Sequence, residues 1–220
     1  MPKSSENKKE LERRAYTFEI RAEEQDGIGV LTGRPIVYNQ LTDIGGYFSE
    51  IIDSGALDGA DLTDVRFMVN HDMSRIPLAR SRRNNGNSTM QFSIDSEGMS
   101  LDWVKLDIKN NPEAAALYSA VKRGDISGMS FAFSVKGEGW DNLDSDYPTR
   151  HITEIGTVVE VSAVTFPAYE ATSINARGKD ALESARSAVE TARQPKADNV
   201  ETKSKDELEL EKAKFFFKNH

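Results

Sequence analysis

Hydrophobic and polar residues begin to alternate after a predominantly polar N-terminal arm. Residues 1–13 contain few apolar side chains, and we predict that this arm is disordered. Tyr16, Phe18 and Ile20 then alternate with polar residues, which is the period-two pattern of a half-buried β-strand. Residues 27–38 continue in the same way and predict the second strand of a hairpin.

The central part of the chain predicts short strands and one helix. Residues 65–69 form a compact apolar run typical of a buried strand, and this run ends at the turn-prone triplet 70–72. Residues 90–94 and 99–108 predict two further strands joined by a turn. A helix is predicted over residues 111–124, because a proline lies in its first turn and a glycine closes it.

The pattern after this helix predicts three more strands and a loop. Apolar residues concentrate at 128–135, 151–155 and 158–166, and the last two segments predict a final pair of strands. Residues 137–149 are acidic and rich in glycine, which indicates a loop. Earlier in the chain, residues 47–57 carry apolar residues with short helical character.

The C-terminal part of the chain is charged and helical in pattern. Residues 179–193 are rich in Ala, Glu and Arg at helical spacing, and residues 205–218 predict a second charged helix. Residues 194–199 have the composition of a linker. We therefore predict a folded domain over residues 14–177 and a removable, charged helical tail over residues 178–220.

Composition excludes several classes of protein. The chain has 220 residues, a formal net charge of −8 and no cysteine. Nucleic-acid-binding proteins are usually basic, so we expect no nucleic-acid partner. Without thiolates or a metal-binding histidine spacing, we expect neither a metal nor another cofactor. No run approaches the roughly eighteen apolar residues of a membrane span, and the N-terminus lacks the apolar segment of a secretory signal. We expect a cytoplasmic protein.

A histidine and a serine adjoin or lie within apolar strands and could act together. His71 is one of only three histidines and lies just after the apolar run at residues 65–69, with Asn70 between them. Ser130 shares one strand face with other small residues, which leaves room for a substrate or an imidazole ring. Ser127 competes for the role of nucleophile, although it precedes a glycine and resembles a turn residue. A serine hydroxyl needs a base within hydrogen-bond reach, and a histidine supplies one.

Glu160 is the preferred third member of this group. It lies within an apolar strand, where a carboxylate is costly to bury unless a partner such as an imidazole pairs with it. His151 is the rival third member, while Asp72 and Asp125 lie close in sequence to their candidate partners. Each of these residues also has a structural interpretation, because alternating polar residues mark any sheet with one solvated face. Taken together, a hydroxyl, an imidazole and an acid predict a serine hydrolase.

Five segments of the chain occur together in the order expected for one family. They are residues 33–39, 46–57, 69–72, 123–133 and 160–169. Each segment is a weak signal alone, but five in order are specific, and they span roughly residues 15–177. This region resembles the HK97-type phage prohead proteases, which are related to the herpesvirus assemblins.

The resemblance implies an α+β, mainly β fold, with a closed antiparallel β-barrel core and surrounding helices. It also implies a serine endopeptidase that works in the host cytoplasm, inside the procapsid. Such an enzyme cleaves the scaffold or the scaffold-like extension of the major capsid protein, and it processes itself. The scaffold and the major capsid protein are therefore the expected partners, and self-association is left open.

The resemblance also assigns roles to individual residues. The family's histidine corresponds to His71, its serine to Ser130 and its third member to Glu160. Herpesvirus relatives use a second histidine in the third role, which keeps His151 as an alternative here. The oxyanion could be stabilised by a backbone N–H near the serine, or by an arginine: Arg75 or Arg80.

Two other functions compete with this hypothesis. One is a non-enzymatic assembly protein that kept the protease fold, and the charged tail is compatible with it. The other is a peptidase or esterase unrelated to phage assembly. The role of the tail is also open. It could be a solvated appendage, or its phenylalanines at 215–217 could dock on the scaffold or capsid.

Overall fold

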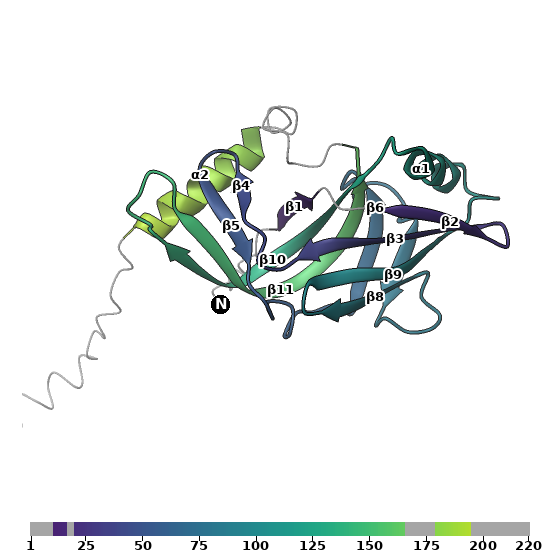
Figure 1. Cartoon of the computed structure of the whole chain (residues 1–220), viewed down its shortest axis with the longest axis horizontal. Helices are drawn as coiled ribbons and strands as arrows, with labels where there is room; N and C mark the ends of the chain where they lie inside the picture. The colour runs from purple at the N-terminus through teal and green to yellow at the C-terminus, as the bar shows by residue number, and fades with distance from the viewer. Residues whose placement is uncertain (1–10, 17–19, 166–178, 195–220) are drawn as a thin grey trace, which may run out of the picture.

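The fold is described from a computed structural model, which covers residues 11–16, 20–165 and 179–194. Within these residues the chain forms two β-sheets and two helices (Figure 1). The elements, in chain order, are β1 (Glu12–Tyr16), β2 (Arg21–Gln25), β3 (Ile28–Val37), β4 (Thr42–Ile44), β5 (Phe48–Ile52), β6 (Asp64–Val69), β7 (Ala79–Arg82), β8 (Met90–Asp95), β9 (Gly98–Leu106), α1 (Pro112–Arg123), β10 (Gly128–Asp141), β11 (Thr149–Val164) and α2 (Lys179–Arg193).

The larger sheet is built around the long antiparallel pair β10 and β11, which cross the molecule in Figure 1. Strand β1 pairs with the outer side of β10. On its other side, β11 pairs in parallel first with β5 and then, near its C-terminal end, with β6. Strands β4 and β7 extend this sheet of seven strands beyond β5 and β6. The ends of β6, β10 and β11 therefore lie side by side.

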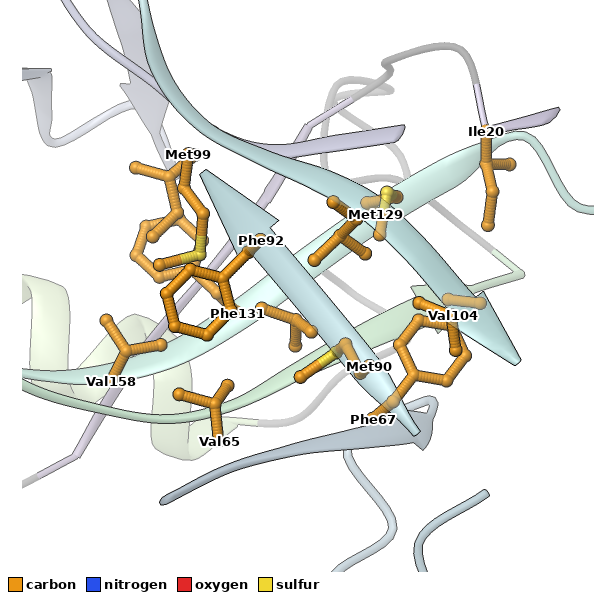
Figure 2. Close-up of a cluster of buried hydrophobic side chains, with 14 of the residues drawn as sticks. Ile20, Val65, Phe67, Met90, Phe92, Met99, Val104, Met129, Phe131 and Val158 are labelled. Atoms are coloured by element: carbon orange, nitrogen blue, oxygen red, sulfur yellow. The ribbon is translucent and has the colours of Figure 1, made fainter. Parts of the chain in front are cut away.

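The smaller sheet has four antiparallel strands in the order β2-β3-β9-β8. It packs on one face of the larger sheet, and the fully buried aromatic side chains of the larger sheet fill the interface. Figure 2 shows part of this cluster, in which Phe67 and Phe131 lie among side chains of β8 and β9. Because Phe131 and Phe133 of β10 fill this face, Ser130, which alternates with them, projects from the opposite face.

Both helices lie at the ends of the molecule (Figure 1). The helix α1 begins as predicted, because the Asn111 side chain accepts hydrogen bonds from two backbone N–H groups of its first turn. It ends at Gly124, whose φ of 80° is the left-handed conformation that glycine adopts readily. The helix α2 has the predicted bounds and packs Ala185 and Val189 against Phe48 of β5.

The expectation of a mainly β fold is confirmed, since strands make up 52% of the structure. The expected closed antiparallel barrel is not confirmed. In the described residues no strand pairing joins the two sheets, and they do not close into a barrel. The sheet is also not wholly antiparallel, because β11 runs parallel to β5 and β6.

Several predicted elements differ in length from those observed. The predicted final pair of strands is a single strand, β11, and the predicted loop at 137–149 shrinks to the residues between β10 and β11. Both long strands contain β-bulges, and glycines at these points interrupt the apolar pattern without ending the strand. The helical character expected at 47–57 is wrong, because its first half forms β5 and the rest forms turns.

The structure can be compared with the predicted domain boundaries at both ends of the folded part. Strand β1 begins at Glu12, so the last two residues of the predicted arm at 1–13 belong to the folded part. At the other end, the first helix of the predicted tail packs on β5, and the predicted second helix at 205–218 lies outside the described residues. No helix in the described part of the chain is long and apolar enough to span a membrane.

Candidate active site

His71 is held in a tight turn at the C-terminal end of β6. Asn70 and His71 have φ values of 53° and 60°, in the left-handed region that asparagine tolerates better than most residues. The Asn70 amide donates to the Thr165 hydroxyl at 3.1 Å and accepts from the Thr165 backbone N–H at 3.0 Å. The turn is therefore locked against the end of β11, and it projects the imidazole over the larger sheet.

Ser130 projects from β10 on the face opposite the core. Its neighbours Met129 and Phe131 are buried in the core, as the strand alternation predicts. Ser130 lies directly opposite Ser162 of β11 in the strand register. Since β11 in turn pairs with β6, the order β10-β11-β6 places the serine two strands from the strand that carries His71.

The imidazole of His71 bridges these strands and brings the three predicted residues together. Its Nε2 lies 2.5 Å from the Ser130 Oγ, and its Nδ1 is hydrogen-bonded to the Glu160 carboxylate. Ser130 and Glu160 have no exposed surface, and His71 is only 9% exposed. The arrangement links a hydroxyl to an imidazole and the imidazole to a carboxylate, which is the geometry that activates a serine nucleophile.

Ser162 is a fourth member of this group that the sequence analysis did not single out. Its hydroxyl donates to Glu160 Oε2 and accepts from the His71 backbone N–H at 3.2 Å. Glu160 therefore has a different partner for each oxygen, and its orientation is fixed. The signal was present in the sequence, because strand alternation places Glu160 and Ser162 on the same face of β11.

The strand β1 covers the Ser130 hydroxyl. Ala15 is the register partner of Ser130, and the Ser130 Oγ donates to the backbone carbonyl oxygen of Arg14 at 2.7 Å. A hydroxyl carries one proton, so it cannot donate to Arg14 and to the imidazole at the same time. The resting contact with β1 therefore competes with the contact that His71 needs.

A buried network of charges fixes β1 in this place. The Arg14 guanidinium binds the Glu50 carboxylate of β5, which is only 1% exposed, through both oxygens. Arg150 of β11 binds Glu12 through two hydrogen bonds of 2.7 and 2.9 Å, and it also contacts Glu50 at 3.1 Å. Glu138 of β10 completes the network by accepting from Arg150.

The charges in this network shift the pKa values of Glu12 and Arg150. Burial alone would raise the pKa of Glu12, but Arg14 and Arg150 outweigh it and lower that pKa to about 2. For Arg150, burial opposes the charged form, yet Glu12 and Glu50 hold its pKa above the ordinary value. Glu12 and Arg150 are therefore held in their ionised forms while β1 is docked.

The rival candidates lie elsewhere. His151 is on β11 but bonds to Asp53 at 2.9 Å, in the half of the strand that pairs with β5. Ser127 is exposed and precedes β10. The Asp72 carboxylate is exposed and accepts from Ser74, which lowers its pKa. Asp125 is exposed and paired with an arginine at the end of α1.

The two arginines considered for the oxyanion are engaged by other carboxylates. Arg75 is 63% exposed and pairs with Glu113 of α1. Arg80 of β7 binds Asp64 at 2.6 Å, and this hydrogen bond raises the Arg80 pKa. Neither contact directs a guanidinium to Ser130, so a backbone N–H is the remaining candidate from the sequence analysis. Among the residues that the structure describes, no cluster of three or more acidic or histidine side chains is arranged to hold a metal ion.

Comparison with known proteins bears on the identity of this site. Searches of curated proteins and of solved structures gave no significant match. A family model described as caudovirus prohead serine protease matches residues 16–186, a span that includes His71, Ser130 and Glu160. The resemblance noted in the sequence is therefore confirmed, and it supports a protease role in capsid maturation. The chain belongs to the caudovirus prohead serine protease family.

Proposed function

We propose that this protein is a serine endopeptidase that cleaves the scaffold, or the scaffold-like extension of the major capsid protein, inside the procapsid. It also processes itself. The observation that carries this proposal is the 2.5 Å approach of the Ser130 Oγ to the His71 Nε2, with Glu160 on the other ring nitrogen. Family membership supplies the setting, because prohead proteases act within the assembling phage capsid.

In the proposed reaction Ser130 is the nucleophile and His71 the general base. The Ser130 Oγ bonds to the carbonyl carbon of the substrate while its proton passes to the His71 Nε2. The C–N bond then breaks, and His71 returns the proton to the leaving amine. Water attacks the resulting ester in the same way, releasing the new carboxyl end and restoring the hydroxyl.

Glu160 acts by orienting the imidazole. Its carboxylate accepts from Nδ1, which leaves Nε2 unprotonated and facing Ser130 in the reactive state. It also stabilises the imidazolium that forms when the proton is transferred. Ser162 positions Glu160 and ties it to the His71 backbone, so the histidine and the carboxylate move as one unit.

The test is co-expression of the protein with its scaffold and major capsid protein. We expect Ser130→Ala to abolish cleavage of these proteins and of the chain itself, because in the described residues no other serine hydroxyl is hydrogen-bonded to the imidazole ring of His71. Ser127→Ala is the matched control, since Ser127 is exposed and outside the site, and it should process normally. Normal processing by the Ser130→Ala protein, read by mass spectrometry of the fragments, would overturn the proposal.

A further inference from the structure

The strand β1 lies on the active-site sheet in the way that an extended peptide binds to a sheet edge. It runs antiparallel to β10, from Glu12 opposite Phe133 to Tyr16 opposite Met129. Without β1, the backbone N–H and C=O groups on this side of β10 would form an open edge, which is a template for a peptide strand. The family model begins at Tyr16, so nearly all of β1 lies outside the matched segment.

The backbone of β1 also presents a peptide bond to the candidate nucleophile. The carbonyl oxygen of Arg14 lies 2.7 Å from the Ser130 Oγ, and Ala15 follows it in the strand. In a peptide bound in this register, the residue at the position of Arg14 would supply the carbonyl next to the serine. The hydroxyl donates to that oxygen in the resting contact, so β1 occupies the site in an unreactive way.

The side chain of Arg14 enters a pocket that is built for a positive charge. Arg14 binds Glu50, which is almost fully buried, and Glu12 at 2.5 Å, and Arg150 and Glu138 extend this group of charges. When Arg14 is removed, Glu12, Glu50 and Glu138 share the single guanidinium of Arg150, so the pocket carries a net negative charge. A buried carboxylate that loses a cation is costly, and a basic substrate side chain would restore the pairing.

A second position of β1 makes a specific contact. Glu12 and Arg14 project from the same face of the strand, two residues apart, while Arg13 points the other way and is exposed. Glu12 binds Arg150 through both of its carboxylate oxygens. These two contacts therefore favour a bound peptide with an acidic residue at the position of Glu12, any residue at the position of Arg13 and a basic residue at the position of Arg14.

We propose that β1 is the chain's own occupant of the substrate site. On this proposal, Glu50 and Arg150 select peptides with a basic residue before the cleaved bond and an acidic residue two positions earlier. This inference rests on the proposed peptidase function, because it assigns the substrate preference of the same site. Substrate must displace β1 to reach Ser130.

The first test measures access to Ser130 with a fluorophosphonate, which reacts with activated serines. The full chain carrying Arg14→Ala should be labelled roughly 10- to 100-fold faster than the wild type, because β1 loses its charged hydrogen bonds to buried Glu50. Arg13→Ala, on the exposed side of the same strand, is the matched control and should label at the wild-type rate. Equal rates for Arg14→Ala and the wild type would overturn the claim that β1 covers the site.

The second test measures selectivity in the full chain carrying Arg14→Ala, whose site is open. A peptide with the sequence of residues 12–16 at its centre should have a kcat/KM roughly 10- to 100-fold above that of the same peptide with leucine at the position of Arg14. Adding Glu50→Gln should bring this ratio close to one. Equal cleavage of the two peptides, or a ratio that Glu50→Gln does not change, would overturn the assignment of the pocket.

The two tests separate this inference from the proposed function. If the fluorophosphonate labels Ser130 and peptides are cut without a basic preference, only the substrate assignment fails. If neither the wild type nor Arg14→Ala is labelled at Ser130, the peptidase function fails, and the inference fails with it.

Discussion

The replacement Glu160→Gln tests the electrostatic logic of the site, because it changes the charge and leaves the volume almost unchanged. The Ser162 hydroxyl donates to one carboxylate oxygen of Glu160, and the same hydroxyl already accepts from the His71 backbone. In the glutamine variant the amide oxygen must therefore face Ser162 to keep that hydrogen bond. The amide NH₂ then points at the His71 Nδ1, where it can only donate.

This rotation forces the wrong tautomer on the imidazole. When Nδ1 accepts a hydrogen bond, the ring proton sits on Nε2, which faces the Ser130 Oγ at 2.5 Å. A protonated Nε2 cannot remove the proton from the hydroxyl. In Ser-His-Asp peptidases the equivalent change from carboxylate to amide lowers kcat about 10,000-fold. That factor corresponds to about 5 kcal/mol of transition-state stabilisation.

The assay is the rate of fluorophosphonate labelling of Ser130 at neutral pH, which requires no natural substrate. We expect Glu160→Gln to slow labelling by roughly 1,000- to 10,000-fold while the protein stays folded. Adding Ser162→Ala should restore part of the rate, because the amide is then free to turn its oxygen toward His71; Ser162→Ala alone is the control. A glutamine variant that labels within about tenfold of the wild type would refute the tautomer argument.

Three further predictions concern β1, the sheets and α2. Acid should release β1. The pKa of Glu12 is about 2 in the docked strand, below its ordinary value of 4.5. The contribution of Glu12 to docking is therefore complete above pH 4.5 and is lost as the pH falls toward 2. Hydrogen exchange of the β1 amides, corrected for intrinsic rates, should rise over this range, and a flat profile would contradict the coupling. Gly98→Ala should lower the free energy of unfolding by about 3 kcal/mol or more, because φ of Gly98 is +131° and the new Cβ would overlap a carbonyl oxygen of β3. Urea titration measures this loss. Gly86→Ala is the control and should change the free energy of unfolding little, because nothing lies within 4 Å of its new Cβ. Val189→Asp should detach α2 from Phe48 and cost about 2 kcal/mol, seen as faster proteolysis within the helix.

Local signals in the sequence predicted the elements that depend on neighbouring residues. The helix α1 was expected because a proline lies in its first turn and a glycine closes it, and in the structure Pro112 begins the helix and Gly124 caps it. Strand β6 was expected from its compact apolar run. These features depend on contacts within a few residues, so the sequence specifies them directly.

The long strands β10 and β11 were underestimated for a definite physical reason. Gly137 and Gly156 interrupt the apolar pattern, and glycines between apolar runs usually indicate loops. In the structure a Cβ at Gly137 would lie 2.8 Å from the Thr153 Oγ1, and one at Gly156 would lie 2.8 Å from the Ser134 Oγ. A larger residue at either position would crowd a side-chain hydroxyl of the facing strand, and only the pairing of distant segments reveals this.

The candidate site was predictable to the extent that strand alternation controls it. Ser130 was chosen because it shares a strand face with small residues, and Glu160 because a carboxylate on an apolar strand needs a partner. The structure places both against His71. The covering strand was not predictable in the same way. Glu12 lies in the predicted arm and Arg14 is the first residue of the predicted domain, and their buried partners are far away in the sequence.

The most direct test of the central claim is whether Ser130, His71 and Glu160 act as one unit. Fluorophosphonate labelling rates of His71→Gln, Glu160→Gln and the double variant provide that test. Since Glu160 is proposed to act only through the imidazole, the double variant should label as slowly as His71→Gln alone, within about threefold. Losses that multiply in the double variant would show that the two residues act independently, and they would contradict the account.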